Sequence, residues 1–90
     1  MERKLMYLTE NELKNIRKSN IDDYVISKIC NAFKIDNDSS CFDEIMVTEN
    51  FDGDFYLDFF NAKDGEYYDF YLKKISEFPD RCIYEIEQVI

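Results

Sequence analysis

Residues 55–72 read FYLDFFNAKDGEYYDFYL, and this stretch decides the fold. Apolar and polar residues alternate on both sides of residues 63–66, which is typical of two strands joined by a tight turn. The Asp64-Gly65 pair readily supplies the positive φ angles of a type I′ turn. The stretch therefore predicts a β-hairpin, with strands near residues 55–60 and 67–73.

A two-residue turn at 64–65 also predicts the register of this hairpin. Phe59 would face Phe70 and Leu57 would face Leu72, on an apolar face. The other face would be rich in tyrosine and carboxylate groups. Because a slip of one residue would mix the two sets, the pattern favours two chemically distinct faces.

The segments around the hairpin extend the predicted sheet. Residues 42–49 alternate in the same way and predict a strand, and residues 50–53 predict a turn after it. Residues 81–90 fit a strand and also fit a helix, and we favour the strand. Residues 4–8 could form a short opening strand. The sheet would then hold three to five antiparallel strands, formed mainly by residues 42–90.

Two helices are predicted in the first third of the chain. Thr9 and Glu12 have the spacing of a capping box, which marks the start of the first helix. The second helix would begin after a cap at Ser19 or Asn20. Its apolar stripe consists of Ile21, Tyr24, Val25, Ile29, Ala32 and Phe33. We therefore expect one α+β domain over residues 1–90, with two N-terminal helices packed on the sheet.

Acidic residues are concentrated in one segment of the chain. Residues 36–69 hold eleven acids and one base, whereas residues 1–35 hold five acids and seven bases. The whole chain has a net charge of −9. Such a chain has no basic patch for a phosphate backbone, and an anionic membrane would repel it. The expected partner is a basic protein.

The cysteines and the hydropathy pattern predict a cytoplasmic protein. Cys30, Cys41 and Cys82 are odd in number and widely spaced, which favours three reduced thiols over a disulfide framework. No stretch approaches the roughly 18–20 apolar residues of a membrane span. Residues 1–8 contain too short an apolar run for a signal peptide.

The sequence argues against catalysis and against a bound cofactor or metal. It contains no histidine, which removes the commonest general base and the commonest transition-metal ligand. Acids at Asp36 and Asp52 resemble the start of a calcium loop, but the twelfth positions are Val47 and Lys63 instead of glutamate. We expect a protein that is not an enzyme and that needs no cofactor.

One face of the predicted hairpin is the candidate binding surface. Tyrosine offers a large rigid contact surface, and carboxylates beside it can pair with arginine. The candidate residues are Asp52, Asp54, Tyr56, Asp58, Phe60, Asp64, Glu66, Tyr67, Asp69 and Tyr71. Two interpretations in which these residues have only a structural role compete with this one. The aromatic rings could lie under another layer of structure, or they could be ordinary cross-strand pairs on a solvated sheet.

These features predict a small acidic inhibitor of the immunity or antitoxin type. It would cover the cleft of a basic, nucleic-acid-binding enzyme, such as a toxin nuclease or a defence nuclease, with carboxylates standing in for phosphates. Toxin immunity proteins and phage inhibitors of nuclease defences share this size and charge, and that comparison rests on those two properties alone. The alternative is a structural or adaptor subunit that forms a homodimer or larger oligomer through the aromatic hairpin face.

Overall fold

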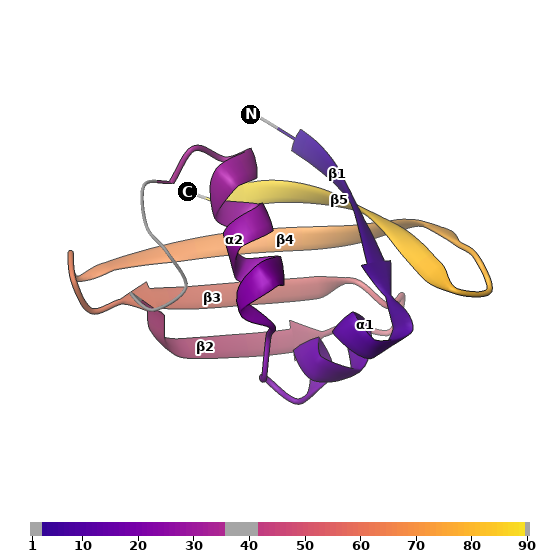
Figure 1. Ribbon diagram of the computed structural model, residues 1–90, viewed down its shortest axis with the longest axis horizontal. Helices are drawn as coiled ribbons and strands as arrows, with labels where there is room; N and C mark the ends of the chain where they lie inside the picture. Colours follow the sequence, from indigo (N-terminus) through magenta and orange to yellow (C-terminus); the bar gives the residue numbers. More distant parts are fainter. Residues whose placement is uncertain (1–2, 36–41, 90) are drawn as a thin grey trace.

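The computed structural model describes residues 3–35 and 42–89, which form two helices and five strands. The elements are β1 (Arg3–Thr9), α1 (Glu10–Arg17), α2 (Asp23–Ala32), β2 (Phe42–Glu49), β3 (Phe55–Asn61), β4 (Glu66–Glu77) and β5 (Arg81–Val89). The strands make one antiparallel sheet in the order β1-β5-β4-β3-β2 (Figure 1). The predicted α+β class is confirmed, the strand favoured at 81–90 is present over the described residues 81–89, and the strand considered possible at 4–8 also forms.

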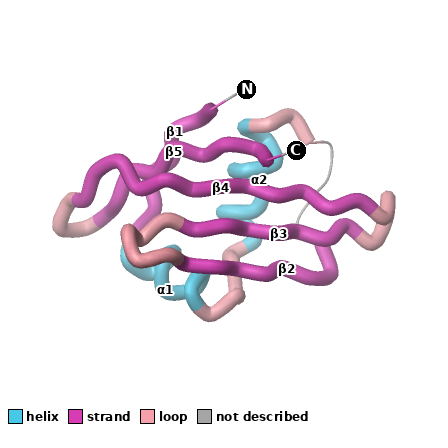
Figure 2. The backbone as a smooth tube through the Cα atoms, turned by 180° about the vertical axis from the view of Figure 1, so that it is seen from behind, coloured by secondary structure: helices cyan, strands magenta, loops and turns pink. Residues whose placement is uncertain are grey.

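Both helices lie against the same face of the sheet, and α2 crosses the strands (Figure 1). Seen from behind, the strands lie in front and both helices lie beyond them (Figure 2). The hydrophobic core fills the space between the two layers. Its fully buried members from β3 and β4 are Phe55, Leu57, Phe59, Phe70 and Leu72. The apolar face predicted for the hairpin is therefore the face that the helices cover.

The first helix begins as the sequence predicts. The backbone N–H of Thr9 donates to Glu12 Oε1 at 2.9 Å, and the backbone N–H of Glu12 donates to Thr9 Oγ1 at 3.2 Å. This reciprocal pair is the predicted capping box. Leu13 and Ile16 are buried on the side of α1 that meets the core.

The cap of the second helix differs from the prediction. Neither Ser19 nor Asn20 caps α2, because both belong to the end of α1: their N–H groups donate to carbonyls of Ile16 and Asn15. Ser19 adopts a positive φ of 57°, the left-handed conformation that often ends a helix. Asp22 takes the cap position instead, without a side-chain capping bond.

The apolar stripe of α2 also differs from the prediction, which included the exposed Tyr24 and omitted the buried Ile26. Tyr24 was predicted to face the core, but it is 65% exposed and Lys28 lies over its ring at 5.0 Å. The buried stripe runs through Val25, Ile26 and Ile29. Tyr24 lies just outside it, because a stripe on a 3.6-residue period is narrower than the run of apolar letters.

The register predicted for the hairpin is wrong by two residues. Leu57 faces Phe70 and Phe59 faces Tyr68, across a loop of residues 62–65. Asn61 sets this longer loop: its buried Oδ1 accepts from the backbone N–H groups of residues 63 and 64, at 2.9 and 3.4 Å. Because side chains alternate with a period of two, a shift of two leaves every residue on its predicted face.

The two described cysteines are buried thiols. Cys30 and Cys82 are both buried and neither forms a disulfide. Cys30 lies on the buried side of α2, and Cys82 lies on β5. The expectation for Cys41 falls outside the described residues.

Candidate functional site

The side chains that alternate with the core residues of the hairpin point away from the helices. We call them the uncovered face: Tyr56, Asp58 and Phe60 of β3, with Tyr67, Asp69 and Tyr71 of β4. The strand pairing sets them directly opposite one another, Tyr56 against Tyr71, Asp58 against Asp69 and Phe60 against Tyr67. The sequence therefore predicted which six residues come together here, although it paired them differently.

Two aspartates face each other at the centre of this surface. The Oδ1 atoms of Asp58 and Asp69 are both shielded from water, and neither meets a hydrogen-bond donor among the described residues. The pKa of Asp58 is raised above its ordinary value, mainly by burial. A hydrogen bond with Asp69 and the charges of Asp69 and Glu44 raise this pKa further. The charged form of Asp58 is therefore disfavoured in the folded protein.

Tyrosines frame the aspartate pair and anchor it. The hydroxyl of Tyr56 donates to Asp69 Oδ2 at 2.6 Å. This bond, together with burial and the charges of Asp69 and Asp58, raises the pKa of Tyr56 to about 12. Phe60 and Tyr67 pack ring to ring at 4.9 Å beside the pair, and Tyr67 is 65% exposed. Aromatic surface and carboxylate oxygen thus alternate across the sheet.

Among the described residues, ion pairs compensate the negative charge on this side of the sheet at the edge formed by β1 and β5. Arg3 on β1 forms ion pairs with Glu85 and Glu87 on β5, at 3.8 and 3.9 Å. Lys73 on β4 lies opposite Glu85 as well. No lysine or arginine occurs in β2 or β3. The excess negative charge therefore lies over β2, β3 and the first half of β4.

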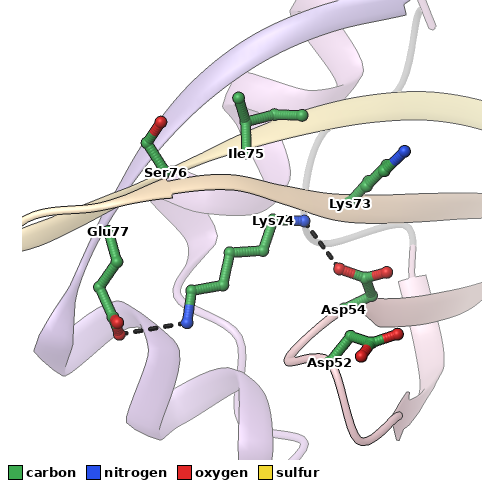
Figure 3. A pocket seen from close by; sticks show the side chains of 7 residues that line it. All are labelled: Asp52, Asp54, Lys73, Lys74, Ile75, Ser76 and Glu77. Carbon is green, nitrogen blue, oxygen red and sulfur yellow. Dashed lines mark hydrogen bonds and ion pairs between the residues drawn. The ribbon is translucent and has the colours of Figure 1, made fainter.

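The predicted residues Asp52 and Asp54 lie away from this centre, in the loop between β2 and β3. Asp52 is exposed, whereas Asp54 is buried and supports the loop. Asp54 accepts from the backbone N–H of Lys74 at 2.8 Å and from the Tyr71 hydroxyl at 2.9 Å. Both aspartates border a depression of about 390 Å³ beside residues 73–77 of β4 (Figure 3).

Burial alone would raise the pKa of Asp54, but the surrounding hydrogen bonds outweigh it. The pKa of Asp54 lies below its ordinary value because its carboxylate accepts hydrogen bonds from Lys74 N–H, Tyr71 and Asn50. The positive charge of Lys73 lowers the pKa further. The charged form of Asp54 is therefore bound into the fold. Its stabilising effect is complete above the pKa of the unfolded chain and is lost as pH falls through the lower pKa of the folded state.

Replacing Asp54 by alanine is expected to lower the free energy of unfolding by about 1–3 kcal/mol near neutral pH. The change leaves the Lys74 N–H and the Tyr71 hydroxyl without their acceptor. Urea unfolding at about pH 7 and about pH 3 measures the effect, which should shrink in acid. Asp52→Ala, in the same loop but exposed, is the control and should change stability little. An equal loss from both variants would contradict this role for Asp54.

The last two predicted residues, Asp64 and Glu66, lie at the opposite end of β3 from Asp52. Asp64 accepts from the Tyr68 hydroxyl at 2.6 Å and from the Glu66 N–H at 2.9 Å, so it holds the hairpin loop. Glu66 is exposed at the start of β4. The ten candidates thus divide into a central group of six and two pairs at the two ends of the hairpin.

Three exposed residues near this surface escaped the sequence prediction. Glu44 and Met46 lie on β2, on the same side of the sheet as Asp58, and Met46 is 66% exposed. The alternation of residues 42–49 already indicated that Glu44 and Met46 share the polar face of that strand. Phe51, in the loop before β3, is fully exposed. A phenylalanine inside an otherwise polar turn was its only signal in the sequence.

The aspartate pair is expected to cost stability. Because the folded state raises the pKa of Asp58, its charged form is disfavoured, so this loss of stability appears as pH rises through that pKa. Asp58→Asn should therefore raise the free energy of unfolding at about pH 7 by roughly 0.2–1 kcal/mol, the range for cross-strand pairs. The gain should vanish at about pH 3. Urea unfolding tests it, and a variant less stable than the parent at neutral pH would refute it.

Within residues 3–35 and 42–89, no three metal-ligating side chains cluster as a metal site would require. No helix of the described chain is long and apolar enough to cross a membrane. Comparisons of the chain with protein-family models, with curated proteins and with solved structures find no match.

Proposed function

We propose that this protein is a small acidic inhibitor that binds a basic, nucleic-acid-binding enzyme through its uncovered face and occludes the substrate cleft. The observation that carries the proposal is the paired aspartates, Asp58 and Asp69, set among aromatic rings on a face that the helices leave open. Two like charges directly opposite each other do not help a sheet to fold. They do suit a surface that receives cationic side chains.

The chemistry of the face matches lysine and arginine in two respects. Carboxylates form short charge-assisted hydrogen bonds with guanidinium groups, and aromatic rings attract cations over their faces. Asp58 and Asp69 supply the carboxylates, and Tyr67 and Tyr71 supply the aromatic rings. Because neighbouring strands lie about 4.8 Å apart, Glu44 and the pair place negative charge on three adjacent strands. A cleft built for phosphates would meet a comparable row of charges.

The experiment begins with capture of the partner and ends with competition. The tagged protein is used to isolate its partner from the cells that produce it, in the cytoplasm where the proposal places it. The purified partner is then offered a fluorescent oligonucleotide with and without the inhibitor. We expect a basic partner from which this protein displaces the oligonucleotide. A partner that is acidic, or that binds both at once, would refute occlusion.

Self-association is the second candidate, and the exposed apolar side chains on the same side of the sheet favour it. Met46 and Tyr67 are 66% and 65% exposed, and together they offer contact surface without charge. A homodimer built on them would bring two aspartate pairs close together, which opposes it. Sedimentation analysis at low and high salt separates the candidates, because apolar self-association would strengthen or persist as salt rises.

A further inference from the structure

Phe51 is the most exposed large apolar side chain among the described residues, at 110% of its reference surface. It lies between β2 and β3, within the turn of residues 50–54. Burying a phenylalanine side chain stabilises a protein, so leaving one in water is unfavourable. Isolated exposed apolar residues are ordinary, and Phe51 draws attention because of how firmly its loop is built.

The loop is fixed from within by Asn50. Its Oδ1 accepts from the N–H groups of Asp52 and Asp54, both at 3.0 Å. The Gly53 N–H donates to the Asn50 carbonyl at 3.2 Å, and the Asn50 N–H donates to the Asp54 carbonyl at 3.0 Å. Gly53 adopts a φ of +83°, which a side chain would strain. The turn therefore has one well-defined backbone conformation.

The loop is also tied to two strands of the sheet. The Tyr84 hydroxyl of β5 donates to the Gly53 carbonyl at 2.9 Å. Asp54 accepts from Lys74 N–H and from the Tyr71 hydroxyl of β4. Asn50 Nδ2 donates to the same hydroxyl at 3.2 Å. A side chain on so rigid a support loses little conformational entropy when it binds.

Charge and position indicate what Phe51 contacts. Of the three acids in residues 49–54, Glu49 pairs with Arg17 at 3.0 Å and Asp54 is buried. Asp52, beside Phe51, is exposed and is the acid of this loop that a partner can reach. Tyr71 of the uncovered face is hydrogen-bonded to Asn50 and Asp54, so the loop adjoins that face. A second copy of this chain would bring another acidic loop or sheet face, which like charge disfavours. The complementary surface is an apolar pocket bordered by lysine or arginine.

We propose that Phe51 is the apolar anchor of the interface, inserted into an apolar pocket of the basic partner while Asp52 meets a cationic side chain at the rim. This inference rests on the proposed function, since it takes the same partner. Anchors of this kind are central aromatic residues that slow dissociation, while surrounding charges guide the encounter. The uncovered face would set the rate of association, and Phe51 would set the lifetime of the complex.

A photoreactive phenylalanine analogue tests the contact inside the producing cells. It is introduced at position 51 and, as a control, at Tyr24, which is 65% exposed on α2. We expect an adduct with a basic protein from position 51 and none from position 24. No adduct at position 51, an equal yield at both positions, or an adduct with a second copy of this chain would overturn the inference.

Affinity measurements on the purified adduct partner complete the test. Phe51→Ala should weaken binding by about 10- to 100-fold, mainly through faster dissociation, whereas Phe51→Tyr should retain most of the affinity. Tyr24→Ala should bind as the parent does, and unchanged melting temperatures establish that the variants fold. A loss of less than about twofold for Phe51→Ala overturns the anchor.

The same measurements separate this inference from the proposed function. If charge reversal at Asp58 and Asp69 leaves binding intact while Phe51→Ala abolishes it, the anchor stands and the uncovered face is not the binding surface. If charge reversal weakens binding and Phe51→Ala does not, the proposed function stands and the anchor is wrong.

Discussion

Replacing Phe59 by alanine is expected to lower the free energy of unfolding by about 3–5 kcal/mol. Phe59 is fully buried beneath the helices, and its ring packs against that of Phe70 at a centroid distance of 5.5 Å. The change removes the whole ring and leaves a cavity that the sheet cannot easily close. Because a domain of this size is stable by only about 5–15 kcal/mol, much of the population should unfold under mild denaturant.

Chemical unfolding followed by circular dichroism measures this loss, and two further phenylalanines serve as controls. Phe60→Ala, at the next position of β3, removes a half-buried ring on the opposite face and should cost less. Phe51→Ala removes a fully exposed ring and should change stability hardly at all. A Phe59→Ala variant that melts within about a degree or two of the parent would contradict the assignment of this face to the core.

Raising the salt concentration from about 50 to about 500 mM is expected to slow association with the basic partner at least about tenfold. Dissociation should change much less. The reason is the uncompensated charge over β2, β3 and the first half of β4, where Glu44, Asp58 and Asp69 have no neighbouring base on β2 or β3. Exposed charges are screened over about 8–10 Å at physiological salt, so long-range attraction fades. Stopped-flow or surface-based kinetics would record both rates.

Charge reversal should reproduce the effect of salt. Asp58→Lys combined with Asp69→Lys removes the acidic centre, and we expect it to slow association as high salt does, with little further salt dependence. Both side chains point away from the buried layer, so the variant should fold. Tyr71→Ala should instead speed dissociation, because an aromatic contact holds the complex after encounter.

Matched charge changes on the other side of the molecule provide the control. Glu10→Lys combined with Asp23→Lys alters net charge equally but lies on the helices, where both residues are exposed. If this control slows association as much as the reversal on the sheet does, net charge alone steers the encounter. If binding ignores both salt and the reversal on the sheet, the inhibitor proposal fails and self-association through apolar contacts takes its place.

The faces of the hairpin could be predicted from sequence, but its register could not. Alternation along residues 55–60 assigns each side chain to the core or to the open side, because successive strand residues point in opposite directions. Register depends on how the loop closes. Asn61 closes it with a buried amide that holds two backbone N–H groups, a tertiary detail that the Asp-Gly signal obscured. The shift places Asp58 against Asp69, and this pair gives the site its character.

The candidate site shows the same division between local pattern and tertiary environment. Asp52 and Asp54 look alike in sequence, two residues apart in one acidic turn. The structure exposes Asp52 and buries Asp54 against Lys74 and Tyr71, so only the former is available to a partner. Phe51 was overlooked because a turn containing one apolar residue has no periodicity from which its exposure could be read.

By itself the sequence determined the α+β class, the capping box of Thr9 and Glu12, the separation of apolar from acidic and aromatic faces, and the segment that holds the excess acid. These properties depend on neighbours within a few residues, where helix and strand periods act. Only the tertiary structure decided that the helices leave one face open (Figure 2). It decided as well that Arg3 neutralises Glu85 and Glu87, which lie on a neighbouring strand of the sheet that is distant in the sequence. It also decided that two aspartates meet across the hairpin. These outcomes depend on which segments lie side by side, and that follows from packing the whole chain around one core.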